Sequence, residues 1–213
     1  MNSSNGNRLL VVSYAFPPMP TQMSPTVAKP MVGLVARGWQ VDVVCADPFS
    51  AYLGREESLL PYVKKHFAEV FRLAPPSHVL GKIRVRLPWV ATTPDLMSVL
   101  QGDAYRLLMR LNLEQYRAVI TWSPFHSINP VLVKVKKSHP KLRWIAQFSD
   151  PWAENPLEDN RLTKLWSRWN EARMVNSADS IIHSSKFSLD LMERNHPGKV
   201  NHKSAVIAHP FDE

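Results

Sequence analysis

The sequence predicts an α/β protein with a Rossmann-like, doubly wound and mostly parallel sheet that carries helices on both faces. Short apolar, β-branched runs alternate with segments of helical spacing along all 213 residues. The runs are continuously apolar, which is typical of parallel strands that are buried on both faces. No change in composition marks a linker, and no internal repeat is present. We therefore expect one domain over residues 1–213.

The first predicted unit is a strand, a loop and a helix. Residues 8–14 form an apolar run that ends at a turn, which indicates a buried strand. The proline-rich loop that follows excludes regular structure, and Ser24 with Pro25 then offers an N-cap and a proline at the first helical position. The helix is expected to end near Arg37. Pro30 inside it predicts either a kink or a helix that begins properly only after this residue.

The second predicted strand covers residues 39–46 and contains Cys45, which we expect to be a buried, inert thiol. A strand, a helix and a strand this close together predict a right-handed crossover between parallel strands. A short helical stretch over 56–65 then precedes a weaker strand candidate at 67–73. Residues 74–93 are rich in proline and show no regular spacing of apolar residues, so they predict a long irregular loop with a functional or docking role.

The rest of the chain alternates four helices with four strands. Helical spacing of apolar residues and short apolar runs identify these elements. The helices are expected at 95–113, 127–138, 159–176 and 186–195, and the strands at 118–122, 142–148, 180–184 and 204–208.

The bulk composition limits the partners and the compartment. The net charge of +8 favours an anionic partner, such as a phosphorylated ligand, acidic lipid headgroups or nucleic acid. The basic residues are dispersed and no nucleic-acid-binding motif is present, so a nucleic-acid-binding protein is the weakest of these readings. A single cysteine excludes an intramolecular disulfide and fits a reducing cytoplasm. The apolar stretch at 9–15 is too short for a signal peptide or a membrane span, so we expect a cytoplasmic protein, soluble or peripheral at the inner face of the membrane.

The sequence motifs of several common enzyme classes are missing. The first strand is not followed by G-x-G-x-x-G or a P-loop, and no G-x-S-x-G elbow is present. The sequence lacks H-E-x-x-H and paired cysteines, so no metal site is predicted. Five of the eight histidines are expected at the surface or at helix ends: His66, His78, His139, His183 and His202.

Polar side chains follow three of the predicted strands. Tyr14 follows the first strand, Ser123 and His126 follow the strand at 118–122, and Asp150 and Glu154 follow the next strand. The carboxyl ends of parallel strands meet at one edge of the sheet, where ligands bind. A histidine and a carboxylate there can act as a general base or bind hydroxyl groups. A histidine that caps the following helix, and an Asp-Pro turn or cap, would give the same sequence.

Several short motifs lie along nearly the whole chain, and the most specific of them is D-P-W-x-x-N-P at 150–156. The others are S-Y-A-F-P-P at 13–18, L-V-A-R-G-W-Q-V at 34–41, P-D at 94–95, T-W-S-P at 121–124, W-I-A-Q-F-S at 144–149, A-D-S-I-I-H-S-S at 178–185 and V-I-A-H-P-F-D-E at 206–213. Together these motifs resemble the N-terminal domain of GT-B glycosyltransferases of the family 4 type.

The resemblance implies one half of a GT-B fold, in which one domain binds the acceptor and the other binds the donor. This half would bind the acceptor of a retaining, nucleotide-sugar-dependent transferase that acts on a glycan or a lipid-linked acceptor in cell-surface polysaccharide synthesis. The donor-binding C-terminal domain is expected to be absent from this chain or to be supplied by a longer parent protein. The chain would then hold no cofactor of its own, would need the nucleotide-sugar donor held by that domain, and would be inactive alone.

The resemblance also suggests roles for residues at the expected cleft. His126 and Asp150 would orient the acceptor hydroxyl, with Trp152 in the same turn as Asp150. Family members often carry a Gly-Gly pair and an arginine in the loop after the first strand, whereas this chain has the polar side chains of Thr21, Gln22 and Ser24 there. A non-catalytic module that binds a glycan or another anionic ligand is the alternative function.

Overall fold

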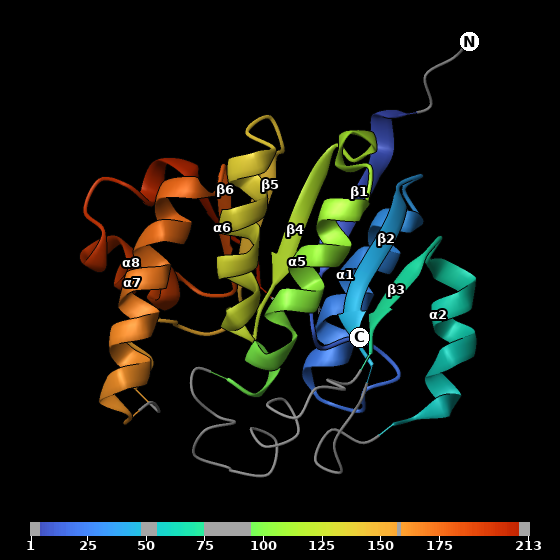
Figure 1. The fold of residues 1–213 in the computed structure, drawn as a ribbon, viewed down its shortest axis with the longest axis horizontal. Coiled ribbons are helices and arrows are strands. Elements are labelled where there is room, and N and C mark those ends of the chain that lie inside the picture. Colours follow the sequence, from blue (N-terminus) through green and yellow to red (C-terminus); the bar gives the residue numbers. More distant parts are fainter. Residues whose placement is uncertain (1–4, 48–54, 75–94, 157–158, 209–213) are drawn as a thin grey trace.

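In a computed structural model, the described residues 5–47, 55–74, 95–156 and 159–208 form one parallel sheet covered by helices on both faces (Figure 1). The sheet of these residues has seven strands in the order β3-β2-β1-β4-β5-β6-β7, and every neighbouring pair is parallel. The strands are β1 (Arg8–Val12), β2 (Gln40–Ala46), β3 (Val70–Leu73), β4 (Ala118–Trp122), β5 (Trp144–Phe148), β6 (Ser180–His183) and β7 (Ser204–Val206). The predicted fold class is confirmed.

The helices lie in two layers. One face of the sheet packs against α1 (Met23–Val35), and the apolar cluster between them contains Val27 and Met31 of the helix and Val43 of β2. On the other face α5 (Gln101–Arg110), α6 (Asn129–Ser138) and α7 (Arg161–Ser177) lie side by side, as Figure 1 shows. Within the described ranges, the other helices are α2 (Leu60–His66), α8 (Lys186–Asn195) and the short 3-10 turns η1 (Asn5–Asn7), η2 (Glu57–Leu59), η3 (Leu96–Leu100), η4 (Leu113–Gln115), η5 (His126–Ile128) and η6 (Asn201–Lys203).

The continuous apolar runs explain why the central strands are buried on both sides. All five residues of β4 are buried, and so are the last six residues of β2. Cys45 has no exposed surface, and its burial raises the pKa of the thiol to about 12. The expectation of a buried, inert thiol agrees with this burial, because the reactive thiolate form is disfavoured.

The start of α1 differs from the prediction. The helix begins at Met23, Gln22 is its N-cap residue without a side-chain hydrogen bond, and Ser24 lies inside the first turn. The Ser24 hydroxyl lies 3.2 Å from the Thr21 hydroxyl instead of capping the helix. The helix also runs through Pro30, so the alternative of a helix that begins after this proline is wrong.

The predicted helix over 95–113 is divided into η3 and α5. The Asp95 carboxylate accepts a hydrogen bond from the Met97 backbone N–H at 3.0 Å and thereby caps the 3-10 turn. A side-chain cap of this kind fixes where the helical segment begins, but the spacing of apolar residues alone does not predict it. The predicted irregular loop at 74–93 lies outside the described residues except for residue 74, and so does the segment from 209 onward.

Candidate functional site

A cavity of about 320 Å³ lies at the carboxyl ends of β4 and β5, which we call the carboxyl-edge cavity. The strand order places β1 beside β4, and the helices that follow these two strands cover opposite faces of the sheet. Ligands of open α/β sheets bind at such a change of face, and this cavity lies next to it, at the ends of β4 and β5. The lining residues come from the strand-end loops and the first turns of α7: Asp95, Pro124, Phe125, His126, Asp150, Trp152, Asn155, Thr163, Trp166 and Ser167.

His126 is held by a hydrogen-bond chain that fixes its protonated nitrogen. The Ser123 hydroxyl donates to the backbone carbonyl of Gln147 at 2.9 Å, and the same oxygen lies 3.2 Å from Nδ1 of His126. A serine hydroxyl has one proton, so an oxygen that donates to the carbonyl can only accept from Nδ1–H. Nε2 is therefore the unprotonated nitrogen and is a hydrogen-bond acceptor.

The His126 ring packs against two aromatic rings that also contact each other, with the Phe148 and Trp152 centroids 6.2 Å apart. Its centroid lies 5.6 Å from that of Phe148 and 5.1 Å from that of Trp152, with interplanar angles of 22° and 14°. Burial lowers the pKa of His126 to about 3, because the charged ring would lose its hydration. The imidazole is thus neutral near pH 7. A base this weak orients a hydroxyl group better than it removes its proton, since proton transfer works best with a pKa near the working pH.

Asp150 brings an exposed carboxylate to the wall of the same cavity. Among the described residues, no hydrogen bond or ion pair involves its side chain, and the N-cap of α7 is Asn160. His126 likewise caps neither η5 nor α6, whose N-cap residues are Phe125 and Ile128. The contacts of the described residues therefore give no support to the capping alternatives for either residue.

The turn after Asp150 is anchored by a buried carboxylate. Glu171 of α7 accepts a hydrogen bond from the Ala153 backbone N–H at 2.9 Å, and its other oxygen lies 3.0 Å from Nε2 of His196. Trp152, which is 4% exposed, stacks on His126 and meets Trp166 edge-on at 5.9 Å. The turn that carries Asp150 is fixed against two helices before any ligand binds.

Asp95 is a lining residue that sequence reasoning did not select. Its carboxylate accepts hydrogen bonds from the Ser127 backbone N–H at 2.8 Å and from the Ser127 hydroxyl at 2.7 Å. Burial raises its pKa, and the hydrogen bonds from Ser127 and Met97 oppose that shift. Tyr14 lies beneath the edge, 1% exposed, and burial raises its pKa well above the usual value, with the nearby Asp95 charge acting in the same direction. The sequence signals for Asp95 were a cap position after a proline and the P-D pair at 94–95.

The remaining predicted site residues lie elsewhere. Thr21, Gln22 and Ser24 lie at the start of α1, and none of them lines the carboxyl-edge cavity. Glu154 forms an ion pair with Arg168 at 2.9 Å and is also absent from the lining. The structure therefore gathers His126, Asp150 and Trp152 on one cavity, with Ser123 behind the histidine, and separates the others from it.

His183 corrects one prediction. It was expected at the surface or at a helix end, but it is fully buried at the carboxyl end of β6. Nδ1 lies 3.1 Å from the Ser188 hydroxyl, and the ring stacks on Phe148 at 6.0 Å. Burial lowers its pKa to about 4. The position within an apolar strand pattern was the signal that could have found it.

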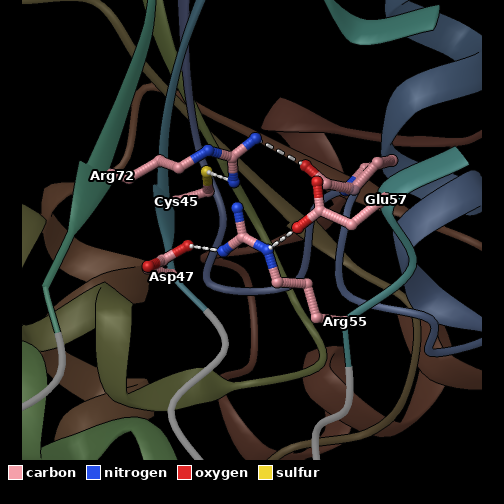
Figure 2. A network of polar contacts seen from close by, with 6 residues as sticks. Cys45, Asp47, Arg55, Glu57 and Arg72 are labelled. Atoms are coloured by element: carbon pink, nitrogen blue, oxygen red, sulfur yellow. Dashed lines mark hydrogen bonds and ion pairs between the residues drawn. The ribbon is translucent and has the colours of Figure 1, made fainter. Parts of the chain in front are cut away.

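The cations near the carboxyl ends of β2 and β3 already have protein partners (Figure 2). Arg72 donates to the Pro17 carbonyl at 2.8 Å and to the Cys45 sulfur at 3.4 Å. Figure 2 shows Arg55 pointing between two carboxylates, those of Asp47 and Glu57, with the first at 2.8 Å. The Arg72 contact with Pro17 holds the loop after β1 against β3, and the two carboxylates compensate the charge of Arg55, whereas these Arg72 partners are neutral groups.

Two further searches concern the described part of the chain. Within it, no group of three or more histidine, cysteine, aspartate or glutamate side chains is placed to hold a metal ion. None of its helices is both long and apolar enough to cross a membrane.

The fold and cavity define a Rossmann-like domain with a ligand site at its carboxyl edge. No family model matches the sequence, and no curated protein matches it. Among solved structures, UGT89C1 of Arabidopsis thaliana complexed with UDP-L-rhamnose aligns with a TM-score of 0.57 at 17% identity, over 97% of this chain and 53% of that chain. UDP-GlcNAc 2-epimerase from Methanocaldococcus jannaschii aligns with a TM-score of 0.52 at 8% identity, over 94% and 45%. LpCGTa in complex with UDP aligns with a TM-score of 0.56 at 14% identity, over 97% of this chain and 53% of that chain.

These likenesses establish the fold. The chain spans about half the length of each of these solved structures. It therefore has the fold of one half of a GT-B protein.

Proposed function

We propose that this chain is the acceptor-binding, N-terminal half of a retaining glycosyltransferase of the family 4 type, acting in the cytoplasm in cell-surface polysaccharide synthesis. A second domain of similar fold would bind the nucleotide-sugar donor, and the acceptor would be a glycan or a lipid-linked sugar. The half-length likeness to the GT-B structures and the D-P-W-x-x-N-P segment support this proposal.

One observation carries the proposal: the carboxyl-edge cavity presents a neutral imidazole acceptor and an unpaired carboxylate on one wall. His126 offers Nε2 as an acceptor, and Asp150 offers two carboxylate oxygens, so both can accept hydrogen bonds from sugar hydroxyls. Trp166 adds a half-buried aromatic ring to the same lining. A small number of placed polar groups beside aromatic surface is the usual composition of a small-ligand site.

In this proposal His126 and Asp150 position the acceptor hydroxyl toward a donor held by the other domain. The ring planes of Phe148 and Trp152 fix the imidazole, and Ser123 fixes its tautomer. Orientation of this kind can account for several powers of ten in rate, because misplacement by about 1 Å costs on the order of a hundredfold.

The test compares sugar transfer from a nucleotide-sugar donor by this chain and by a longer protein that contains both domains. The chain alone should show no turnover, and Asp150→Asn and His126→Ala in the longer protein should each lower turnover by about a hundredfold. His202→Ala and Glu114→Gln, exposed changes before β7 and β4 at the opposite edge of the sheet, are the matched controls. Turnover by the isolated chain, or wild-type rates in both cavity variants, would contradict the assignment.

A non-catalytic glycan-binding module remains the second candidate because of the low pKa of His126. A neutral imidazole with a pKa of about 3 is suited to binding hydroxyls and poorly suited to proton transfer. Saturable glycan binding by the chain, lost in Asp150→Asn and accompanied by no turnover in the longer protein, would favour this function over transfer.

A further inference from the structure

The outer face of α7 carries three large apolar side chains that are mostly exposed. Leu162 is 71% exposed, Leu165 is 62% exposed and Trp169 is 61% exposed. Residues three, four and seven positions apart lie on one side of a helix, so the three form a continuous stripe over two turns. We call this the α7 stripe. Single exposed apolar residues are ordinary on a protein surface, but an aligned set on one helix marks a contact surface.

A row of basic residues runs beside the α7 stripe. Each apolar residue of the stripe directly follows a basic residue in the sequence, and these basic residues are Arg161, Lys164 and Arg168, of which Arg168 is also ion-paired with Glu154. They share the stripe's spacing and therefore form a parallel row about 100° around the helix. On the other side, the Arg173 guanidinium lies 4.2 Å from the centroid of the Trp169 ring. The only acidic residue of α7 is Glu171, which is buried and held by Ala153 and His196.

We propose that the outer face of α7 docks on the surface of an anionic lipid bilayer. A bilayer offers an apolar interior for the stripe and negative headgroups for the basic row, and helices with this division of residues lie in the plane of the interface. Trp169 suits the boundary between the two regions, and the long Lys and Arg side chains can reach the headgroups.

Charge decides against two other occupants of this face, a second copy of the chain and nucleic acid. A second copy of the chain that used the same face would bring the basic row against itself, because a two-fold contact pairs identical patches. Nucleic acid would attract the basic row but would leave the apolar stripe in water. A bilayer with acidic headgroups complements both rows at once.

The position of α7 links this surface to the cavity. The inward-facing residues of its first two turns, Thr163, Trp166 and Ser167, line the carboxyl-edge cavity, while the stripe points away from the core. Figure 1 shows α7 at the margin of the helical layer, beyond α6. Docking would hold the mouth of the cavity close to the headgroups, where a lipid-linked ligand is presented. The docking itself does not depend on the proposed sugar transfer.

The test measures co-sedimentation of the 213-residue chain with two kinds of vesicle, phosphatidylcholine alone and phosphatidylcholine mixed with phosphatidylglycerol. We expect at least about tenfold stronger binding to the mixed vesicles, with a decrease as salt is added. The triple variant Leu162→Gln, Leu165→Gln, Trp169→Gln should lower binding about a thousandfold or more, because each of the three buried apolar side chains contributes about tenfold or more. Lys164→Gln should lower it about fivefold. Phe187→Gln, which removes an equally exposed aromatic ring from α8, should have no effect.

Each alternative has its own outcome. Absence of vesicle binding, equal binding to both vesicle types, or unchanged binding by the triple variant would overturn the proposal. A concentration-dependent dimer in sedimentation velocity that the triple variant abolishes would assign the stripe to a second copy instead. An unchanged thermal midpoint of the triple variant is expected, because exposed helix positions tolerate glutamine well.

Discussion

Acid should destabilise this fold through two histidines that burial keeps neutral. Burial lowers the pKa of His126 to about 3 and that of His183 to about 4. An unfolded chain has histidines with a pKa of about 6.5. Between these values the unfolded chain binds a proton that the folded chain does not bind, so the free energy of unfolding falls as the pH falls. The stabilisation is fully present above pH 6.5 and is lost progressively down to about pH 3 to 4.

The size of the effect follows from the same values. Lowering the pH from about 7 to about 5 should reduce the free energy of unfolding by about 2 kcal/mol for each histidine, because the unfolded form becomes almost fully protonated and the folded form does not. The sum of about 4 kcal/mol is a large part of the 5 to 15 kcal/mol that is ordinary for a domain, so a clear loss of stability near pH 5 is expected.

Urea unfolding at the two pH values and constant ionic strength measures this effect. The variant His183→Asn should lose about 2 kcal/mol less between the two pH values than the wild type, because one titrating group is gone. The variant should also be less stable near neutral pH, since the stacking of the ring on Phe148 is lost. His202→Asn, an exposed substitution, is the control. An identical pH dependence in His183→Asn and the wild type would refute the reasoning.

Two further predictions concern the buried polar groups of β2. Asp42 has no exposed surface, its carboxylate lies 2.7 Å from Nη2 of Arg8, and it accepts a hydrogen bond from the Tyr116 hydroxyl at 2.8 Å. Asp42→Ala should therefore lower the free energy of unfolding by about 3 kcal/mol, because the variant leaves the Arg8 charge without its partner. Tyr116→Phe should lower it by about 1 kcal/mol, because only one hydrogen bond is lost. Equal losses in urea titrations of the two variants would contradict this ranking. Cys45, whose burial raises the pKa of its thiol to about 12, should not react with a thiol reagent in the folded protein near pH 8 and should react fully in concentrated guanidinium chloride; rapid labelling of the folded protein would show that the strand opens.

Some elements could be predicted to the residue because their signals are local. The strand at 118–122 and the helix at 186–195 have the same bounds in the structure as in the sequence prediction. The start of α1 was placed wrongly because two sequence signals, Ser24 and Pro25, fit the first turn of a helix as well as its cap. Pro25 is tolerated there because the first four backbone N–H groups of a helix have no partner within the helix.

Some of the residues that line the cavity could be predicted from the sequence, and others could not. His126 and Asp150 follow adjacent strands, so their approach was predicted by the rule that parallel strands end at one edge. Asp95 reaches the cavity from a distant segment through Ser127, and Ser167 and Trp166 reach it from a helix that packs across the edge. None of these contacts has a local pattern that could reveal it.

The sequence by itself determined the alternation of strands and helices, the parallel sheet and the strand ends that carry polar groups, because hydrophobic periodicity is a property of neighbouring residues. Only the tertiary structure decided the strand order, the burial of His183 and the tautomer of His126. It also decided that the α7 stripe faces outward while the opposite side of the same helix lines the cavity. These features depend on which distant segments pack together, and packing sets the solvent exposure and the hydrogen-bond partners that fix a protonation state.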